Sequence, residues 1–139
     1  MTAVEVDPAG ASREDQGTAV SATILIADDD SVSRKLLGRL LMQDGHEVRA
    51  AADGVEALEL FAVGGADIVL LDIVMPGLDG IALALKASKD HPAMRILLMT
   101  GFAAERQRAH NLEALIHTVI TKPFSLDEIV AAVAAALAE

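Results

Sequence analysis

Cysteine, tryptophan and tyrosine are absent from the 139 residues of the sequence. Without cysteine the chain has neither disulfides nor thiolate metal sites, which is consistent with a reducing cytoplasm. Its length is nevertheless sufficient for one domain with a substantial apolar core. We therefore expect a single domain that is stabilised by its core alone.

Basic residues are also scarce, because 11 Lys and Arg stand against 21 Asp and Glu, and the formal net charge is −10 at pH 7. A general nucleic-acid binder needs a basic face for the phosphates, so we do not expect nucleic acid as a partner. No apolar run reaches the length of a transmembrane helix. We expect a soluble, cytoplasmic protein without membrane insertion, whose partners are proteins, phosphorylated molecules or cations.

Residues 1–22 differ in composition from the rest of the chain. They combine four acidic residues and one arginine with Pro, Gly and Ser, and they show no periodic apolar face. They also lack the basic start and continuous apolar stretch of a signal peptide. We predict a disordered acidic tail over 1–22 and one folded domain over 23–139.

From Thr23 onward, short apolar runs alternate with amphipathic stretches. The runs predict strands at 24–27, 48–51, 68–71, 96–99 and 119–121. Helical spacing of apolar residues predicts helices at about 32–41, 57–61, 80–89, 104–115 and 129–137. Helix starts are indicated by Asp30 or Ser31, by Asp53 with Glu56, by Asp79, and by Ser125 with Glu128. Such repeats predict an α/β fold with parallel strands, right-handed crossovers and helices on both faces of the sheet.

The strand predicted at 68–71 raises a chemical question, because it ends in Asp72. Four consecutive large aliphatic residues indicate a strand buried on both faces, and a carboxylate at its end needs a reason. Helix capping fits poorly, since Pro76 and Gly77 indicate a loop and Asp79 is better placed as the cap. A purely structural role of Asp72 remains an alternative.

Other polar residues follow the remaining strands, and they are Asp28, Asp29, Asp30, Thr100 and Lys122. Each has an ordinary explanation: one of the aspartates as a helix cap, Thr100 as a turn residue, and Lys122 as a lysine reaching water. In a parallel sheet, however, the carboxyl ends of the strands share one edge, where ligands bind. The combination of acids, a hydroxyl and an ammonium at that edge points to a functional site.

The chemistry of this combination suits phosphoryl transfer. Carboxylates that converge from two strands repel one another, and a Mg²⁺ ion would relieve that repulsion while accepting phosphate oxygens. Asp72 is then placed as a nucleophile that forms an acyl phosphate. Thr100 and Lys122 are placed to bind the phosphoryl oxygens.

These residues resemble the receiver domains of bacterial two-component response regulators, the CheY-like superfamily. The resemblance covers the chain from about Thr23 onward and rests on the segments ILIADDD, LLDIVMPGLDG, LLMTG and ITKPF in this order. It implies a three-layer (βα)5 flavodoxin-like fold with strand order 2-1-3-4-5. It also implies a protein that catalyses only its own phosphorylation and dephosphorylation and is otherwise not an enzyme.

The resemblance assigns roles to individual residues. Asp72 would be the phosphoacceptor, Asp28 and Asp29 the acidic pair that holds Mg²⁺ with Asp72, and Val74 a further ligand through its backbone carbonyl. Of the acidic pair, Asp29 would be the likelier direct ligand. Thr100 and Lys122 would bind the phosphoryl group, and the Lys122–Pro123 bond would be cis.

Two departures from the family pattern concern the switch region formed by Thr100, Phe102 and Val119. Receivers commonly carry Tyr or Phe at the position of Val119, so the usual aromatic readout is in doubt. Phe102 is a candidate for part of that role, and a packing or partner-contact function is an equal alternative. Val74 and Phe102, which by family geometry flank the phosphoryl group, are both apolar. We predict that they disfavour the hydrolytic water and slow self-dephosphorylation.

The resemblance also implies partners. A histidine kinase or histidine phosphotransfer protein would dock on the first helix near Arg34, Lys35 and Arg39, and a downstream protein target would bind the fourth-helix region, the fifth strand and the last helix. We expect no DNA-binding or enzymatic output domain after the last helix. The segments DIVMPGLDGIALALKAS and TGFAAE resemble stand-alone receivers that act as proteolysis adaptors in alphaproteobacterial cell-cycle circuits.

Three alternatives stay open. The same residues fit an intermediate phosphate carrier in a phosphorelay. An aspartyl-phosphate phosphatase similar to the haloacid dehalogenases would need an acid at Val74, which argues against it. A receiver-shaped binding module that is never phosphorylated is the third alternative, although every chemical position is present.

Overall fold

The computed structural model describes residues 21–75, 79–101 and 118–138. Five parallel strands form one sheet in the order β2-β1-β3-β4-β5. The strands are β1 (Thr23–Ala27), β2 (Glu47–Ala51), β3 (Ile68–Asp72), β4 (Arg95–Thr100) and β5 (Thr118–Thr121). The predicted fold class and strand order are confirmed.

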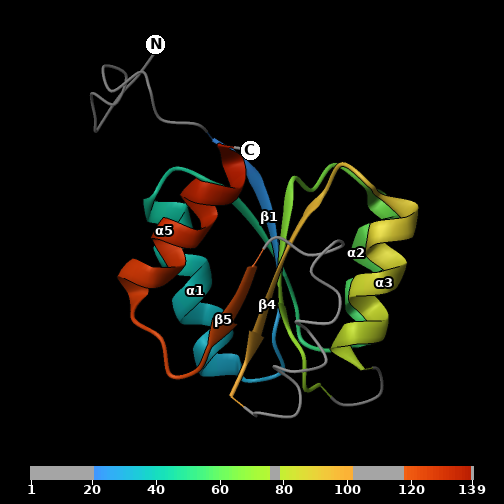
Figure 1. Cartoon of the computed structure of the whole chain (residues 1–139), viewed down its shortest axis with the longest axis horizontal. Helices are drawn as coiled ribbons and strands as arrows, with labels where there is room; N and C mark the ends of the chain where they lie inside the picture. The colour runs from blue at the N-terminus through green and yellow to red at the C-terminus, as the bar shows by residue number, and fades with distance from the viewer. Residues whose placement is uncertain (1–20, 76–78, 102–117, 139) are drawn as a thin grey trace.

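Helices cover both faces of the sheet, so the domain has three layers (Figure 1). Helices α1 (Ser31–Gln43) and α5 (Leu126–Leu137) pack on one face, and α2 (Gly54–Val63) and α3 (Gly80–Asp90) pack on the other. None of the helices in the described part of the chain is long and apolar enough to cross a membrane. The predictions for the first 20 residues, Phe102 and the helix at 104–115 lie outside the described residues.

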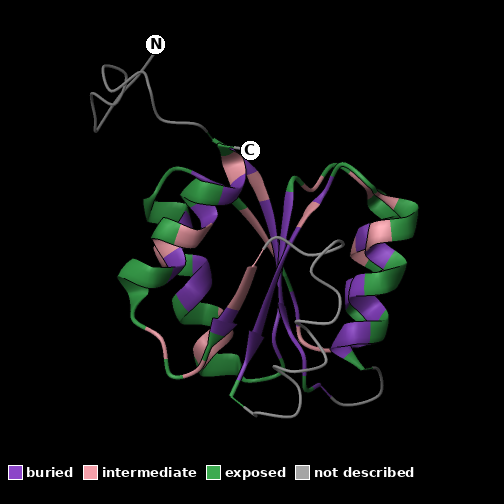
Figure 2. Ribbon diagram, in the orientation of Figure 1, coloured by how far each residue is buried: buried purple, intermediate pink, exposed green. Residues whose placement is uncertain are grey.

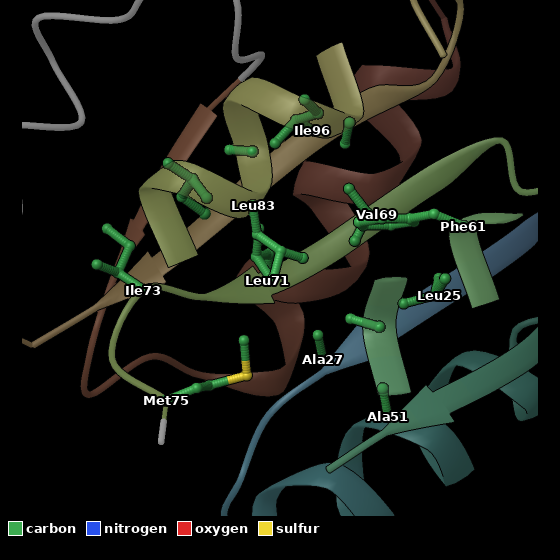
Figure 3. Close-up of a cluster of buried hydrophobic side chains, with 14 of the residues drawn as sticks. Leu25, Ala27, Ala51, Phe61, Val69, Leu71, Ile73, Met75, Leu83 and Ile96 are labelled. Atoms are coloured by element: carbon green, nitrogen blue, oxygen red, sulfur yellow. The ribbon is translucent and has the colours of Figure 1, made fainter. Parts of the chain in front are cut away.

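The central strands of the sheet are buried (Figure 2). Their side chains alternate between two apolar clusters, one on each side of the sheet. All five residues of β3 are buried. Val69 and Leu71 point toward α2 and α3, where they meet Phe61 and Leu83 (Figure 3), while Leu70 belongs to the cluster under α1 and α5. The apolar run that leads to Asp72 is therefore a central strand, as its sequence predicts.

The helix starts agree with the capping signals. Asp30 caps α1 by accepting hydrogen bonds from the amides of Val32 and Ser33, and Asp79 caps α3. Ser125 and Glu128 form a reciprocal capping box at α5. At α2 the Asp53 side chain accepts from the Glu56 amide, but Glu56 reaches back to the amide of Ala52 instead of that of the cap. Because Asp30 is used as a cap, Asp28 and Asp29 remain for other roles.

The amino end of β1 is joined to the turn between α1 and β2. The Ser21 hydroxyl donates to the Gly45 carbonyl at 2.6 Å, and the Ala22 amide donates to Nδ1 of His46 at 3.1 Å. His46 is 7% exposed. Gly45 has a φ of 95°, the left-handed conformation that glycine commonly adopts just beyond the end of a helix. These bonds anchor β1 at the edge opposite to the polar strand ends.

Candidate functional site

The parallel register brings the polar strand ends to one edge of the sheet. Asp28 directly follows β1, Asp72 and Thr100 end β3 and β4, and Lys122 directly follows β5. Their relative positions follow from the residue pairs Ala27–Leu71, Asp72–Met99 and Thr100–Thr121. Residues that are far apart in the sequence thus become neighbours.

Three carboxylates meet at this edge. Asp28, Asp29 and Asp72 each offer one carboxylate oxygen, and these oxygens lie within 4.8 Å of one another. Asp28 and Asp72 are buried, while Asp29 is exposed. The cluster is therefore open to solvent on one side and closed by protein on the other.

Asp28 has an incomplete set of hydrogen bonds. Its Oδ1 accepts from the amide of Asp30 at 3.0 Å. Its Oδ2 is fully buried and has no hydrogen-bond partner, although buried polar atoms are normally paired. A cation that binds among the three carboxylates would satisfy this oxygen, and a set of carboxylate ligands suits a hard cation such as Mg²⁺. The residues present therefore fit the predicted metal.

Asp72 is oriented by two donors. The ammonium Nζ of Lys122 lies 3.0 Å from Oδ2, and the amide of Val74 donates to Oδ1 at 3.1 Å. The ion pair joins residues 50 positions apart in the sequence. The orientation of the Asp72 carboxylate at the end of β3 is consequently fixed through both of its oxygens.

Burial and charge act against each other in this ion pair. Burial raises the pKa of Asp72, and the charge of Asp28 adds to the rise, while Lys122 and the Val74 amide lower it less strongly. Burial acts to lower the pKa of Lys122, but the hydrogen bond and charge of Asp72, together with the charges of Asp28 and Asp29, raise the pKa overall. The cost of the buried charge falls on the aspartate because its side chain is 8% exposed and that of the lysine 31%. The positive charge of Lys122 is thus held beside Asp72, whose ionised form is disfavoured by burial.

Thr100 and Lys122 are joined through the backbone. The Lys122 amide donates to the Thr100 carbonyl at 2.8 Å, and Thr100 is 1% exposed. The Lys122–Pro123 bond is cis, as the family resemblance implies. The hydroxyl of Thr100 and the ammonium of Lys122 therefore belong to neighbouring residues at the ends of β4 and β5.

The remaining predicted residues differ in their surroundings. Val74 is 47% exposed in the loop after β3. Val119 is half-buried and packs against the apolar cluster on the α2 and α3 side. The metal contact predicted for the Val74 carbonyl and the switch role predicted for Val119 stay predictions, and Phe102 lies outside the described residues.

Gly80, the first residue of α3, belongs to the site, although its sequence position indicates only the start of a helix. A methyl group at this position would lie 2.5 Å from both the Asp72 carbonyl oxygen and Cα of Ile73. The Gly80 amide also donates to the Ile73 carbonyl at 2.9 Å. Helix α3 therefore presses directly on the backbone that carries Asp72. The signal in the sequence is a glycine directly after the cap Asp79, where helix propensity favours other residues.

Residues 24–134 match the family described as "Response regulator receiver domain". The chain belongs to this family. Among curated relatives of this receiver, response regulator MprA of Mycobacterium sp. (strain KMS) is 38% identical over 114 residues, which are 82% of this chain and 50% of that protein. MprA of Mycobacterium tuberculosis (strain CDC 1551 / Oshkosh) is 36% identical over 118 residues, or 85% of this chain and 51% of that protein. The receiver spans about half the length of these curated relatives.

Solved structures share the fold of this receiver. A response regulator receiver domain protein (CheY-like) from Methanospirillum hungatei JF-1 superposes with a TM-score of 0.80 at 28% identity, covering 86% of this chain and 95% of that one. The receiver domain of NtrX from Brucella abortus has a TM-score of 0.76 at 31% identity, covering 83% and 98%. The fold that brings the strand ends of this receiver together is thus one that solved structures also have.

Proposed function

We propose that this receiver accepts a phosphoryl group on Asp72 from a phosphohistidine donor and signals through a changed protein-binding surface. The observation that carries the proposal is the environment of Asp72. Its carboxylate is hydrogen-bonded to the Lys122 ammonium and lies beside two further acids, one of which has a buried oxygen without a partner. A purely structural role of Asp72 does not explain why the neighbouring Asp28 keeps a buried oxygen without a partner.

The proposed reaction uses the side chains in distinct ways. An oxygen of the Asp72 carboxylate attacks phosphorus, a P–O bond forms, and the P–N bond to the donor imidazole breaks with its electron pair left on nitrogen. The Lys122 ammonium is 3.0 Å from Oδ2 of Asp72. It is therefore close enough to stabilise negative charge on the carboxylate before the reaction and on the phosphoryl oxygens during it. Thr100 is expected to bind a second phosphoryl oxygen.

Asp28, Asp29 and Asp72 would hold Mg²⁺. When bound, this ion supplies positive charge that offsets the three carboxylates and stabilises the phosphoryl oxygens. The carboxylates set where that charge sits, since Asp28 is fixed in the protein interior and Asp29 stands at the solvent side. The reaction should consequently require a divalent cation.

Intact-mass measurement after incubation with acetyl phosphate and Mg²⁺ tests the proposal. The native chain is expected to gain one phosphoryl group, and Asp72→Asn none. Asp90→Asn serves as a control because it removes an acid whose partner is Lys86 on the surface of α3; it should be phosphorylated like the native chain. Absence of any mass gain in the native chain, despite demonstrated Mg²⁺ binding and rapid trapping, would favour the unphosphorylated binding module instead.

The lifetime of the acyl phosphate is proposed to depend on Val74. This residue is 47% exposed, two positions after Asp72, and its apolar side chain neither donates to nor accepts from a hydrolytic water. Val74→Asn is expected to shorten the half-life of the phosphorylated protein, followed by loss of the added mass after removal of acetyl phosphate. An unchanged half-life would refute this role.

The phosphodonor protein is proposed to dock on α1. Val32 and Leu36 lie one helical turn apart and are 73% and 47% exposed, and the basic residues Lys35 and Arg39 are exposed on the same helix. Exposed apolar residues at helical spacing, with basic residues beside them, suit a helical partner. Leu36→Glu is expected to slow phosphorylation by a histidine kinase or phosphotransfer protein while leaving phosphorylation by acetyl phosphate unchanged. Equal slowing with both donors would argue against docking there.

Two roles in the cytoplasm fit the same chemistry, namely an endpoint regulator and an intermediate carrier in a phosphorelay. A carrier would return its phosphoryl group to a second histidine protein, so transfer from the phosphorylated chain to such a protein distinguishes them. The proteolysis-adaptor role rests on sequence segments alone and is tested by phosphorylation-dependent binding to a protease or adaptor in a pull-down.

A further inference from the structure

Arg34 contacts the acidic loop from the first helix. Its guanidinium donates from a terminal nitrogen to the backbone carbonyl oxygen of Asp28 at 2.8 Å. The Arg34 side chain is half-buried, whereas the neighbouring basic residues Lys35 and Arg39 are exposed. Arg34 is therefore turned toward the site and differs from the other basic residues of α1.

The position of Arg34 is electrostatically unfavourable for the helix itself. The amino end of a helix carries partial positive charge and favours acidic side chains. The first turn of α1 contains no acidic residue, and Arg34 is the fourth residue of the helix. The contact with the Asp28 carbonyl offsets this disadvantage, and it places a positive charge at the backbone of Asp28.

The backbone and side chain of Asp28 are restrained from three directions. Its amide donates to the Ala51 carbonyl of β2 at 3.1 Å. Its Oδ1 accepts from the Asp30 amide at 3.0 Å, and its carbonyl accepts from Arg34. Of these three bonds, only the one from Arg34 comes from a side-chain donor. The remaining oxygen, Oδ2, is the buried atom without a partner.

We propose that Arg34 is a positioning residue for the cation site. By holding the Asp28 carbonyl it keeps the Asp28 carboxylate within ligand distance of Asp29 and Asp72, and this increases the affinity for Mg²⁺. The inference rests on the proposed function of the site. It removes Arg34 from the docking surface of α1 and leaves Lys35 and Arg39 there.

Charge and position make opposite predictions for the loss of Arg34. If its positive charge were all that mattered, removal would strengthen binding of a cation by the nearby carboxylates. If Arg34 positions Asp28, removal weakens binding, because residues that orient metal ligands commonly affect affinity strongly. The sign of the change therefore separates the two explanations.

Titration calorimetry with Mg²⁺ alone measures the affinity, since the chain has no tryptophan or tyrosine to report binding by fluorescence. Arg34→Met keeps an unbranched apolar stem and removes the donors and charge of the guanidinium. It is expected to raise the Mg²⁺ dissociation constant about 10-fold. Lys35→Met, which removes a charge from the same helix without a contact to Asp28, should leave the dissociation constant unchanged or lower it. Arg34→Lys, which keeps the charge and a donor, should restore part of the affinity.

Native or tighter Mg²⁺ binding by folded Arg34→Met would overturn the proposal. Circular dichroism and thermal melting in chelator show whether each variant folds, and Arg34→Gln repeats the test if Arg34→Met does not. Failure of both variants to fold would also overturn it, because the contact would then support the fold and not the site. If the native chain itself bound no Mg²⁺, the proposed function would fail, and this inference with it. The native titration separates that outcome from a failure of the Arg34 proposal alone.

Discussion

Replacement of Gly80 by alanine should displace the phosphoacceptor while leaving its side chain intact. The added methyl would lie 2.5 Å from the Asp72 carbonyl oxygen, 2.5 Å from Cα of Ile73 and 2.7 Å from the Ile73 carbonyl oxygen. Carbon contacts in proteins are comfortable at about 3.5 Å, so helix and strand must separate by about 1 Å. All three atoms belong to the backbone, and no side-chain rotation relieves the contact.

A shift of this size is large for a catalytic group. Displacements of about 1 Å commonly cost about 100-fold in rate, and overpacking of a core costs about 1–3 kcal/mol in stability. We therefore expect Gly80→Ala to be phosphorylated by acetyl phosphate about 100-fold more slowly than the native chain. We also expect it to unfold at a lower urea concentration. Intact mass measured over time and urea titration followed by circular dichroism give the two quantities.

Gly38→Ala is the matched control. Gly38 is a buried glycine in α1, and a methyl there would meet only Cγ1 of Val48 at 3.7 Å, an ordinary contact. Alanine in a helix interior is about 0.5–1 kcal/mol more favourable than glycine, so Gly38→Ala should be more stable and equally reactive. Native phosphorylation kinetics in Gly80→Ala would refute the reasoning, because the close approach would then have no influence on Asp72.

Three further predictions concern the acids and the opposite edge of the sheet. Asp28→Asn removes a buried charge whose Oδ2 has no hydrogen-bond partner; in chelator its free energy of unfolding should rise by about 1 kcal/mol, and the stabilisation by Mg²⁺ seen in urea titrations of the native chain should disappear. Easier unfolding of Asp28→Asn in chelator would contradict this. Burial raises the pKa of Asp72, so the folded state favours the protonated form of this side chain. The stability that protonated Asp72 contributes is complete below the pKa of the unfolded chain and is lost as pH rises through the pKa of the folded protein. Urea titrations in chelator should therefore show that the native chain loses stability between these two pKa values, whereas Asp72→Asn does not. Parallel pH profiles of the native chain and Asp72→Asn would exclude this explanation. His46→Ala removes the buried acceptor of the Ala22 amide, and the free energy of unfolding should fall by about 1–3 kcal/mol. An unchanged urea midpoint would show that the amide finds another partner.

The local elements of this receiver follow from its sequence because their signals are local. A run of aliphatic residues indicates a buried strand, and a cap residue acts within three positions of itself, as Asp30 and Ser125 do. The candidate site follows from the same information with one added step. Once the strands are taken as parallel, their carboxyl ends must share an edge, so Asp72 and Lys122 are brought together although they are 50 positions apart.

The tertiary structure alone decides how these residues are held. The sequence does not reveal that Asp28 keeps one buried oxygen without a partner, that the Arg34 guanidinium bonds the Asp28 carbonyl, or that α3 rests on the backbone of Ile73 at Gly80. Each of these features depends on a distance between segments that belong to different elements. Periodicity and capping specify which element a residue occupies and which face it lies on. The distance of closest approach between two elements is set by the packing of the whole core, to which every buried side chain contributes.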